Sequence, residues 1–123
     1  MEEPHRLKRI VWIGSSRKDL KSFPDEVKRL IGYALYQAQI GGKALSAKPL
    51  SGFGSAGVLE VVQDYQTDAY RAVYTVRLGE FVYVLHAFQK KSKRGVAIPR
   101  PDSTLIKARL KTAEEDYKLR QAG

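Results

Sequence analysis

Residues 81–94 read FVYVLHAFQKKSKR, and this stretch decides how the chain folds. It begins with apolar, aromatic and β-branched residues and ends in four cations within five positions: Lys90, Lys91, Lys93 and Arg94. An uninterrupted apolar run of this length predicts a buried strand. Because a buried strand holds the residues that follow it in place, we expect the cations to form a fixed anion-binding site.

The composition of the chain indicates one compact domain with a polyanionic partner. We expect a single domain over residues 1–123, since this length supports one core. Lys and Arg number 22 against 13 Asp and Glu, which gives a net charge of +9. This balance favours a nucleic-acid partner, and an acidic protein would also satisfy it. The chain has no cysteine, which excludes disulfides and zinc–thiolate sites.

The N-terminal segment contains one short apolar run, at residues 10–13, before polar residues resume. A run of this length is too short for a signal peptide or a membrane-spanning helix. We therefore expect a cytoplasmic protein with no membrane partner.

Two helices are predicted after a first strand at residues 10–13. Ser16 and Asp19 have the spacing of a capping box for a short helix, and Ser22 and Pro24 mark the start of a second. The second helix has a predicted core stripe at three- and four-residue spacing: Val27, Leu30, Ile31, Ala34, Leu35 and Ala38. A Gly-Gly pair then ends it, and residues 43–57 are predicted to form a loop.

The second half of the chain predicts three consecutive strands and a final helix. The strands are expected at residues 58–65, 70–78 and 80–88, in an antiparallel meander. The helix is expected from about residue 102 to residue 118. The order β-α-α-β-β-β-α predicts an α+β fold, a small antiparallel sheet with the helices packed on one face.

Four cations are the first candidates for a phosphate site. The middle strand is predicted to project Arg71 and Arg77 from one face, and its neighbour leads into Lys90 and Lys91. Arginine offers a planar pair of donors to a phosphate, and lysine offers a point charge. For Lys93 and Arg94, a solvated basic surface is an equally good interpretation.

Three further residues have an ordinary structural interpretation beside the functional one. His86 can carry protons near neutral pH, yet it lies inside VYVLHAF, on the predicted face of Val84 and Phe88, where a core histidine is more usual. Tyr83 can stack on a base, and it is more often a packing residue. Glu60 can act as an acid or a base, and its interpretation as an ion-pair partner of Arg71 is favoured. The acidic residues show no metal-binding pattern, so we expect neither a metal nor a cofactor.

Taken together, five stretches resemble the RelE/HigB-like toxins of bacterial toxin–antitoxin pairs, in the phage-related branch of the RelE/ParE superfamily. They are VWIGSSRKDLKSFPDEV, AKPLSGFGSAGVLEVV, YRAVYTV, YVLHAFQKKSKRG and PRPDSTLIKARLKTAEEDY. The resemblance spans residues 10–117 and implies a small α+β endoribonuclease that cuts messenger RNA on the ribosome without a metal. It also implies a cognate helix-turn-helix antitoxin as partner.

In such enzymes the RNA 2′-hydroxyl attacks the adjacent phosphate, so the site needs a base, cations and an acid. The resemblance implies that Arg71 holds the phosphate and that Lys90 and Lys91, in the FxKK motif, supply charge and the base. His86 and Tyr83 are candidates for proton transfer. RNA contacts are expected from Arg77, Lys93, Arg94 and Lys48.

Two other functions fit the same residues. The fold also serves ParE-like toxins, which inhibit DNA gyrase and cut no RNA, and a non-catalytic nucleic-acid-binding phage protein would carry the same charge. Mapping of RNA 5′ ends separates them, because cuts within translated messages follow from the nuclease alone.

Overall fold

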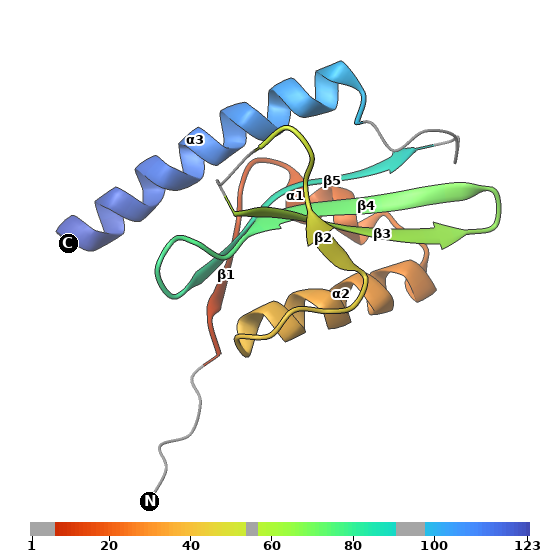
Figure 1. Ribbon diagram of the computed structural model, residues 1–123, viewed down its shortest axis with the longest axis horizontal. Helices are drawn as coiled ribbons and strands as arrows, with labels where there is room; N and C mark the ends of the chain where they lie inside the picture. The colour runs from red at the N-terminus through yellow and green to blue at the C-terminus, as the bar shows by residue number, and fades with distance from the viewer. Residues whose placement is uncertain (1–6, 54–56, 91–97) are drawn as a thin grey trace, which may run out of the picture.

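The computed structural model describes residues 7–53, 57–90 and 98–123, which form one five-stranded sheet and three helices (Figure 1). This arrangement confirms the predicted α+β class. In chain order the elements are β1 (Arg9–Trp12), α1 (Ser16–Lys21), α2 (Asp25–Gln39), β2 (Ala47–Pro49), β3 (Val58–Tyr65), β4 (Asp68–Thr75), β5 (Phe81–Lys90) and α3 (Arg100–Ala122).

The sheet has the order β1-β5-β4-β3-β2, and the predicted meander β3-β4-β5 forms its centre. Its antiparallel strands pair in sequence, with Tyr65 opposite Asp68 across a two-residue turn in which Gln66 has a φ of 56°. The short strand β1 lies parallel to the first half of β5, from Arg9 opposite Phe81 to Trp12 opposite Val84. The second half of β5 therefore extends beyond β1.

The helices cover both faces of the sheet, which corrects the prediction that they share one face. Figure 1 shows α2 and α3 on opposite sides of the strands. One core cluster joins α2 to side chains such as Ala72 and Tyr74, and the other joins α3 to side chains such as Val73 and Tyr83. The physical reason is visible in β4, where every residue from Ala69 to Thr75 is buried. A strand that is apolar on both faces needs cover on both.

Helix α2 follows the predicted stripe with one exception. Val27, Ile31 and Ala34 are almost completely buried against the sheet. Leu30 is 42 % exposed, so its assignment to the core was wrong. It lies one position before the buried row, and a helix turn of 3.6 residues directs it toward solvent.

Strand β2 lies inside the predicted loop at residues 43–57, and this part of the prediction was wrong. It pairs antiparallel with β3 at the edge of the sheet, with Lys48 opposite Glu60. Three residues are too few to show an alternating pattern, and Pro49 is tolerated because the strand has only one neighbour. The middle strand also ends earlier than predicted, at Thr75 rather than at residue 78.

Helix α3 is longer than predicted, at 23 residues, and only Ile106 and Ala113 of its side chains are buried. None of the helices in the described part of the chain has the length and apolar character needed to cross a membrane.

Replacement of Ile106 by alanine tests the packing of α3. Ile106 is 0 % exposed in the core cluster between α3 and the sheet. The variant should therefore lose about 2–5 kcal/mol of unfolding free energy in urea titration. Leu119→Ala, at a side chain exposed on the same helix, should change it by less than about 0.5 kcal/mol. Equal effects of the two substitutions would contradict the observed docking of α3.

Candidate functional site

One face of the sheet gathers most of the polar candidates, and the strand register shows how. Paired residues share a face, as do residues two apart along a strand. Glu60 lies opposite both Lys48 and Val73, Val73 lies opposite His86, and Ala69 lies opposite Lys90. Since Arg71 falls between Ala69 and Val73, it shares this face. We call this surface, on the α3 side of the sheet, the site face; it carries Lys48, Glu60, Arg71, His86 and Lys90.

A β-bulge in β5 brings the end of that strand onto the site face. Tyr74 pairs with Val84 and Val73 pairs with His86, so Leu85 is the extra residue between them. The extra residue reverses the alternation of every side chain that follows. His86 therefore shares its face with Phe88 but not with Val84, which corrects the predicted grouping of the three.

Arg71 is held at the centre of the site face by a buried carboxylate. Its Nη1 lies 3.3 Å from Oε2 of Glu60, and the two side chains are only 6 % and 5 % exposed. The predicted ion pair is therefore confirmed. The other oxygen of Glu60 lies 3.8 Å from Nζ of Lys48, whose side chain is 55 % exposed. The three groups form a cluster in which Lys48 is the open side and Arg71 the buried side.

His86 connects β5 to the first turn of α3. Its Nε2 lies 2.7 Å from Oδ1 of Asp102, and its Nδ1 lies 3.4 Å from Nη1 of Arg109. The ring also stacks on Phe88, with centroids 4.7 Å apart. Both ring nitrogens therefore have a partner on α3, and His86 is buried between β5 and that helix.

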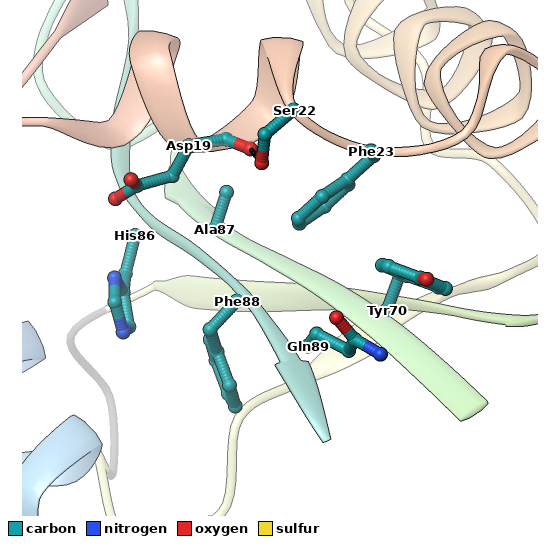
Figure 2. A pocket seen from close by; sticks show the side chains of 8 residues that line it. All are labelled: Asp19, Ser22, Phe23, Tyr70, His86, Ala87, Phe88 and Gln89. Carbon is teal, nitrogen blue, oxygen red and sulfur yellow. Dashed lines mark hydrogen bonds between the residues drawn. The ribbon is translucent and has the colours of Figure 1, made fainter. Parts of the chain in front are cut away.

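A hollow of about 320 Å³ opens beside the second half of β5, where β1 no longer covers that strand (Figure 2). Figure 2 shows His86 and Phe88 on one side of the strand and Ala87 on the other, toward Asp19. The hollow reaches from the site face around the strand to α1 and so gives access to one end of the site face.

Lys90 is the last residue of β5, next to the site centre. Phe88 lies opposite Arg71, so Lys90 and His86 are the diagonal neighbours of Arg71, at about 7–8 Å. The other cations of the run, Lys91, Lys93 and Arg94, lie outside the described residues.

Arg77 does not share the site face. Because β4 ends at Thr75, Arg77 follows the strand at the end opposite to Lys90, where its side chain is exposed. It packs over Gly57, where an added Cβ would lie 2.3 Å from its side-chain carbons.

Tyr83 is also separate from the cluster, because it lies completely buried under the second half of α3. Its hydroxyl donates to Oδ2 of Asp116 at 2.8 Å, and Arg120 donates to the same oxygen at 2.6 Å. Burial, followed by the hydrogen bond to Asp116, raises the pKa of Tyr83 to about 12. The hydrogen bond from Arg120, followed by that from Tyr83, lowers the pKa of Asp116. Tyr83 is therefore a fixed contact for α3.

Sequence reasoning missed Asp102 and Arg109, which α3 contributes beside His86. Arg109 donates to the carbonyl oxygen of Leu85 at 3.0 Å and to Oγ of Ser15 at 3.1 Å. Both residues lie on α3, and the sequence does not show which face of the sheet this helix covers. Without that information, neither residue could be placed beside His86. Within residues 7–53, 57–90 and 98–123, no three His, Asp or Glu side chains gather in a group able to hold a metal ion.

Comparison with known families assigns the chain. The family of phage-derived Gp49-like proteins matches residues 18–111, which is most of the sequence. The chain belongs to the Gp49-like family. This is a family of RelE-like toxins, as the sequence resemblance predicted. The match spans α2, the strands β2 to β5 and the first half of α3, and so includes all five residues of the site face.

Among solved structures, the Gp49-like chain is similar to a chain of the toxin–antitoxin complex RelBE2 from Mycobacterium tuberculosis. The two are 16 % identical, with a TM-score of 0.47, over 74 % of this chain and 100 % of the other. No curated protein matches it in sequence.

Tyr83→Phe tests the hydrogen bond to Asp116 that holds this tyrosine under α3, away from the cluster. Unfolded tyrosine ionises near pH 10, whereas the folded protein keeps the Tyr83 proton to about pH 12. Between these values the folded state binds more protons, so the free energy of unfolding falls as pH rises from 10 to 12. Tyr83→Phe should reduce this fall by about 1–2 kcal/mol, measured by urea unfolding at pH 9 and 11.5.

The matched control is Tyr33→Phe, at an exposed tyrosine, which should keep the wild-type dependence on pH. If Tyr83→Phe kept it as well, the contact between Tyr83 and Asp116 would not hold in solution.

Proposed function

We propose that this protein is the toxin of a toxin–antitoxin pair and acts as a metal-independent endoribonuclease on messenger RNA at the ribosome. Membership of the RelE-like Gp49 family supports the toxin. The observation that supports the nuclease activity is the contact of Arg71 and Lys48 with one carboxylate, Glu60, on the site face.

The reaction needs groups that hold a phosphate while its charge grows. The 2′-hydroxyl attacks the neighbouring phosphorus, the bond to the 5′-oxygen of the next nucleotide breaks, and a 2′,3′-cyclic phosphate forms. A fixed guanidinium can stabilise two oxygens of the crowded phosphate at once. Glu60 fixes the direction of Arg71, so little reorganisation is required when the charge develops.

Access sets the order of contacts with the RNA. Lys48 and Lys90 stand on either side of Arg71 across the face, and Lys48 is the more open member of the buried cluster. In the proposed order of binding, a phosphate first contacts Lys48. It then moves between Lys48 and Glu60, where Arg71 can reach it. Lys90, with Lys91 next to it in the chain, supplies charge on the other side.

Proton transfer follows from the same cluster. Glu60 is in contact with both cations that hold the phosphate, so it is the described carboxylate best placed to take the 2′-hydroxyl proton. The leaving oxygen would take its proton from the side of Lys90. Neither His86 nor Tyr83 is required, because both are engaged with α3.

The proposed protein partner is a cognate helix-turn-helix antitoxin. Support comes from the family and from the net charge of +9, since a basic RNA-binding surface also attracts an acidic inhibitor.

Lys48→Ala and Arg71→Ala should abolish growth arrest and remove cuts within translated messages. The expected loss of cleavage is about 10²–10³-fold for Arg71→Ala, measured by mapping RNA 5′ ends shortly after induction. Lys48 is well exposed, so its removal leaves folding intact. Arg29→Ala, at an exposed arginine on α2, is the matched control and should remain toxic.

Glu60→Gln separates positioning from proton transfer, because the amide oxygen still accepts from Arg71 but cannot take a proton. A cleavage rate that falls about 10²-fold or more supports the proton role. Unchanged cleavage assigns Glu60 to positioning alone. Intact transcripts in cells arrested by the wild-type protein would overturn the nuclease and favour a gyrase inhibitor.

A further inference from the structure

The outer side of α2 and the segment that follows it expose an unusual share of apolar side chains. Seven large apolar residues are exposed in the described part of the chain, and five of them belong to this region: Leu30, Tyr33, Tyr36, Ile40 and Leu45. Tyr33 is 60 % exposed, and Leu45 is fully exposed. Single exposed leucines are ordinary, whereas a contiguous group marks a surface that is covered by a partner.

Three of these residues, Leu30, Tyr33 and Leu45, line a hollow of about 410 Å³, which we call the α2 groove. Leu30, Tyr33 and Gln37 line one wall, and Lys43, Leu45 and Ser46 line the other. The second wall belongs to the segment that turns back along α2 toward β2 (Figure 1). A hollow with a leucine on each wall has the shape to receive an apolar side chain.

Helix α2 is apolar on two sides, of which its own core uses only one. The inner side packs on the sheet through residues such as Val27, Ile31 and Leu35. Tyr33, Tyr36 and Ile40 follow one another at three- and four-residue spacing on the outer side. Gly32, one turn before Tyr36, leaves the backbone bare, since an added Cβ there would meet no atom within 4 Å. Mid-helix glycine costs about 1 kcal/mol relative to alanine, and internal packing does not explain it.

The charges around the α2 groove favour an acidic partner. Lys43 lines the groove, and Arg29 is exposed one turn before Tyr33. No acidic side chain lines it, and the carboxylates of α2, Asp25 and Glu26, stand in the first turn. A second copy of this chain would bring its own net charge of +9 and meet repulsion. Nucleic acid could stack on the tyrosines but would leave the aliphatic leucines of the groove unmatched.

We propose that the α2 groove is a docking site for an acidic, amphipathic segment of a partner protein, which inserts an apolar side chain between Leu30 and Leu45. Tyrosine and arginine carry much of the binding energy at protein interfaces. Tyr33 lines the groove, and Tyr36 and Arg29 are exposed on the same helix. The α2 groove lies on the side of the sheet opposite to the site face, so a docked segment leaves the RNA-cutting cluster uncovered. The inference therefore does not depend on the proposed nuclease.

Selection from a displayed library of random peptides of about 16 residues, four helical turns, tests the proposal on the full-length protein. Enriched peptides should carry Asp or Glu together with apolar residues at helical spacing. The best peptide, synthesised with a fluorophore, is then titrated against variants and followed by anisotropy. Leu45→Glu and Lys43→Glu should each weaken its binding about tenfold or more.

Two matched controls keep the test specific. Leu119→Glu and Lys111→Glu introduce the same changes at exposed positions of α3 and should leave binding unchanged. Loss of binding in these controls, enrichment of basic peptides, or no enrichment would overturn the proposal.

Two further outcomes would assign the surface to another occupant and also overturn the proposal. One is a single-stranded RNA 12-mer whose binding is lost in Leu45→Glu but kept in Leu119→Glu. The other is self-association in sedimentation velocity that Leu45→Glu alone removes.

Discussion

One extra residue in β5 determines which side chains can meet on the site face. Before the bulge, Val84 points toward α2; after it, His86, Phe88 and Lys90 point toward α3. Without Leu85 as the extra residue, the strict alternation of a strand would place Lys90 on the opposite face from Arg71. The bulge also fixes the first half of α3, because His86 binds Asp102 and the carbonyl of Leu85 accepts from Arg109. The site and its cover therefore share one local cause.

Polar contacts hold α3 against the sheet along its length, because the helix buries only two of its side chains. His86 with Asp102 secures its beginning, Arg109 its middle, and Tyr83 with Asp116 its second half. Two glycines permit the close approach: Arg109 lies over Gly14, and Tyr117 lies over Gly79, both with positive φ. A buried pair such as Glu60 and Arg71 adds little net stability, since desolvation offsets its attraction.

Much of the fold and part of the site follow from the sequence. The meander, α2 and the pair of Arg71 with Glu60 were predictable because long apolar runs and strand alternation are local signals. The side of the sheet that α3 covers was not predictable, because both faces of β4 are apolar and each needs cover. Neither Arg77 nor Tyr83 joined the cluster, because Arg77 lies beyond the end of β4 and Tyr83 is covered by the second half of α3. The short strand β2, which delivers Lys48, has too few residues to show a pattern.

The chemistry of the RNA ends tests the central claim most directly. Translating ribosomes are incubated with the purified protein, and the ends of the cut message are identified by enzymatic labelling and mass spectrometry. Attack by the 2′-hydroxyl at a phosphate held by Arg71 predicts a 2′,3′-cyclic phosphate on one fragment and a 5′-hydroxyl on the other, and no cuts with Arg71→Ala. Fragments with a 5′-phosphate and a free 3′-hydroxyl, or a message left intact, would contradict the account.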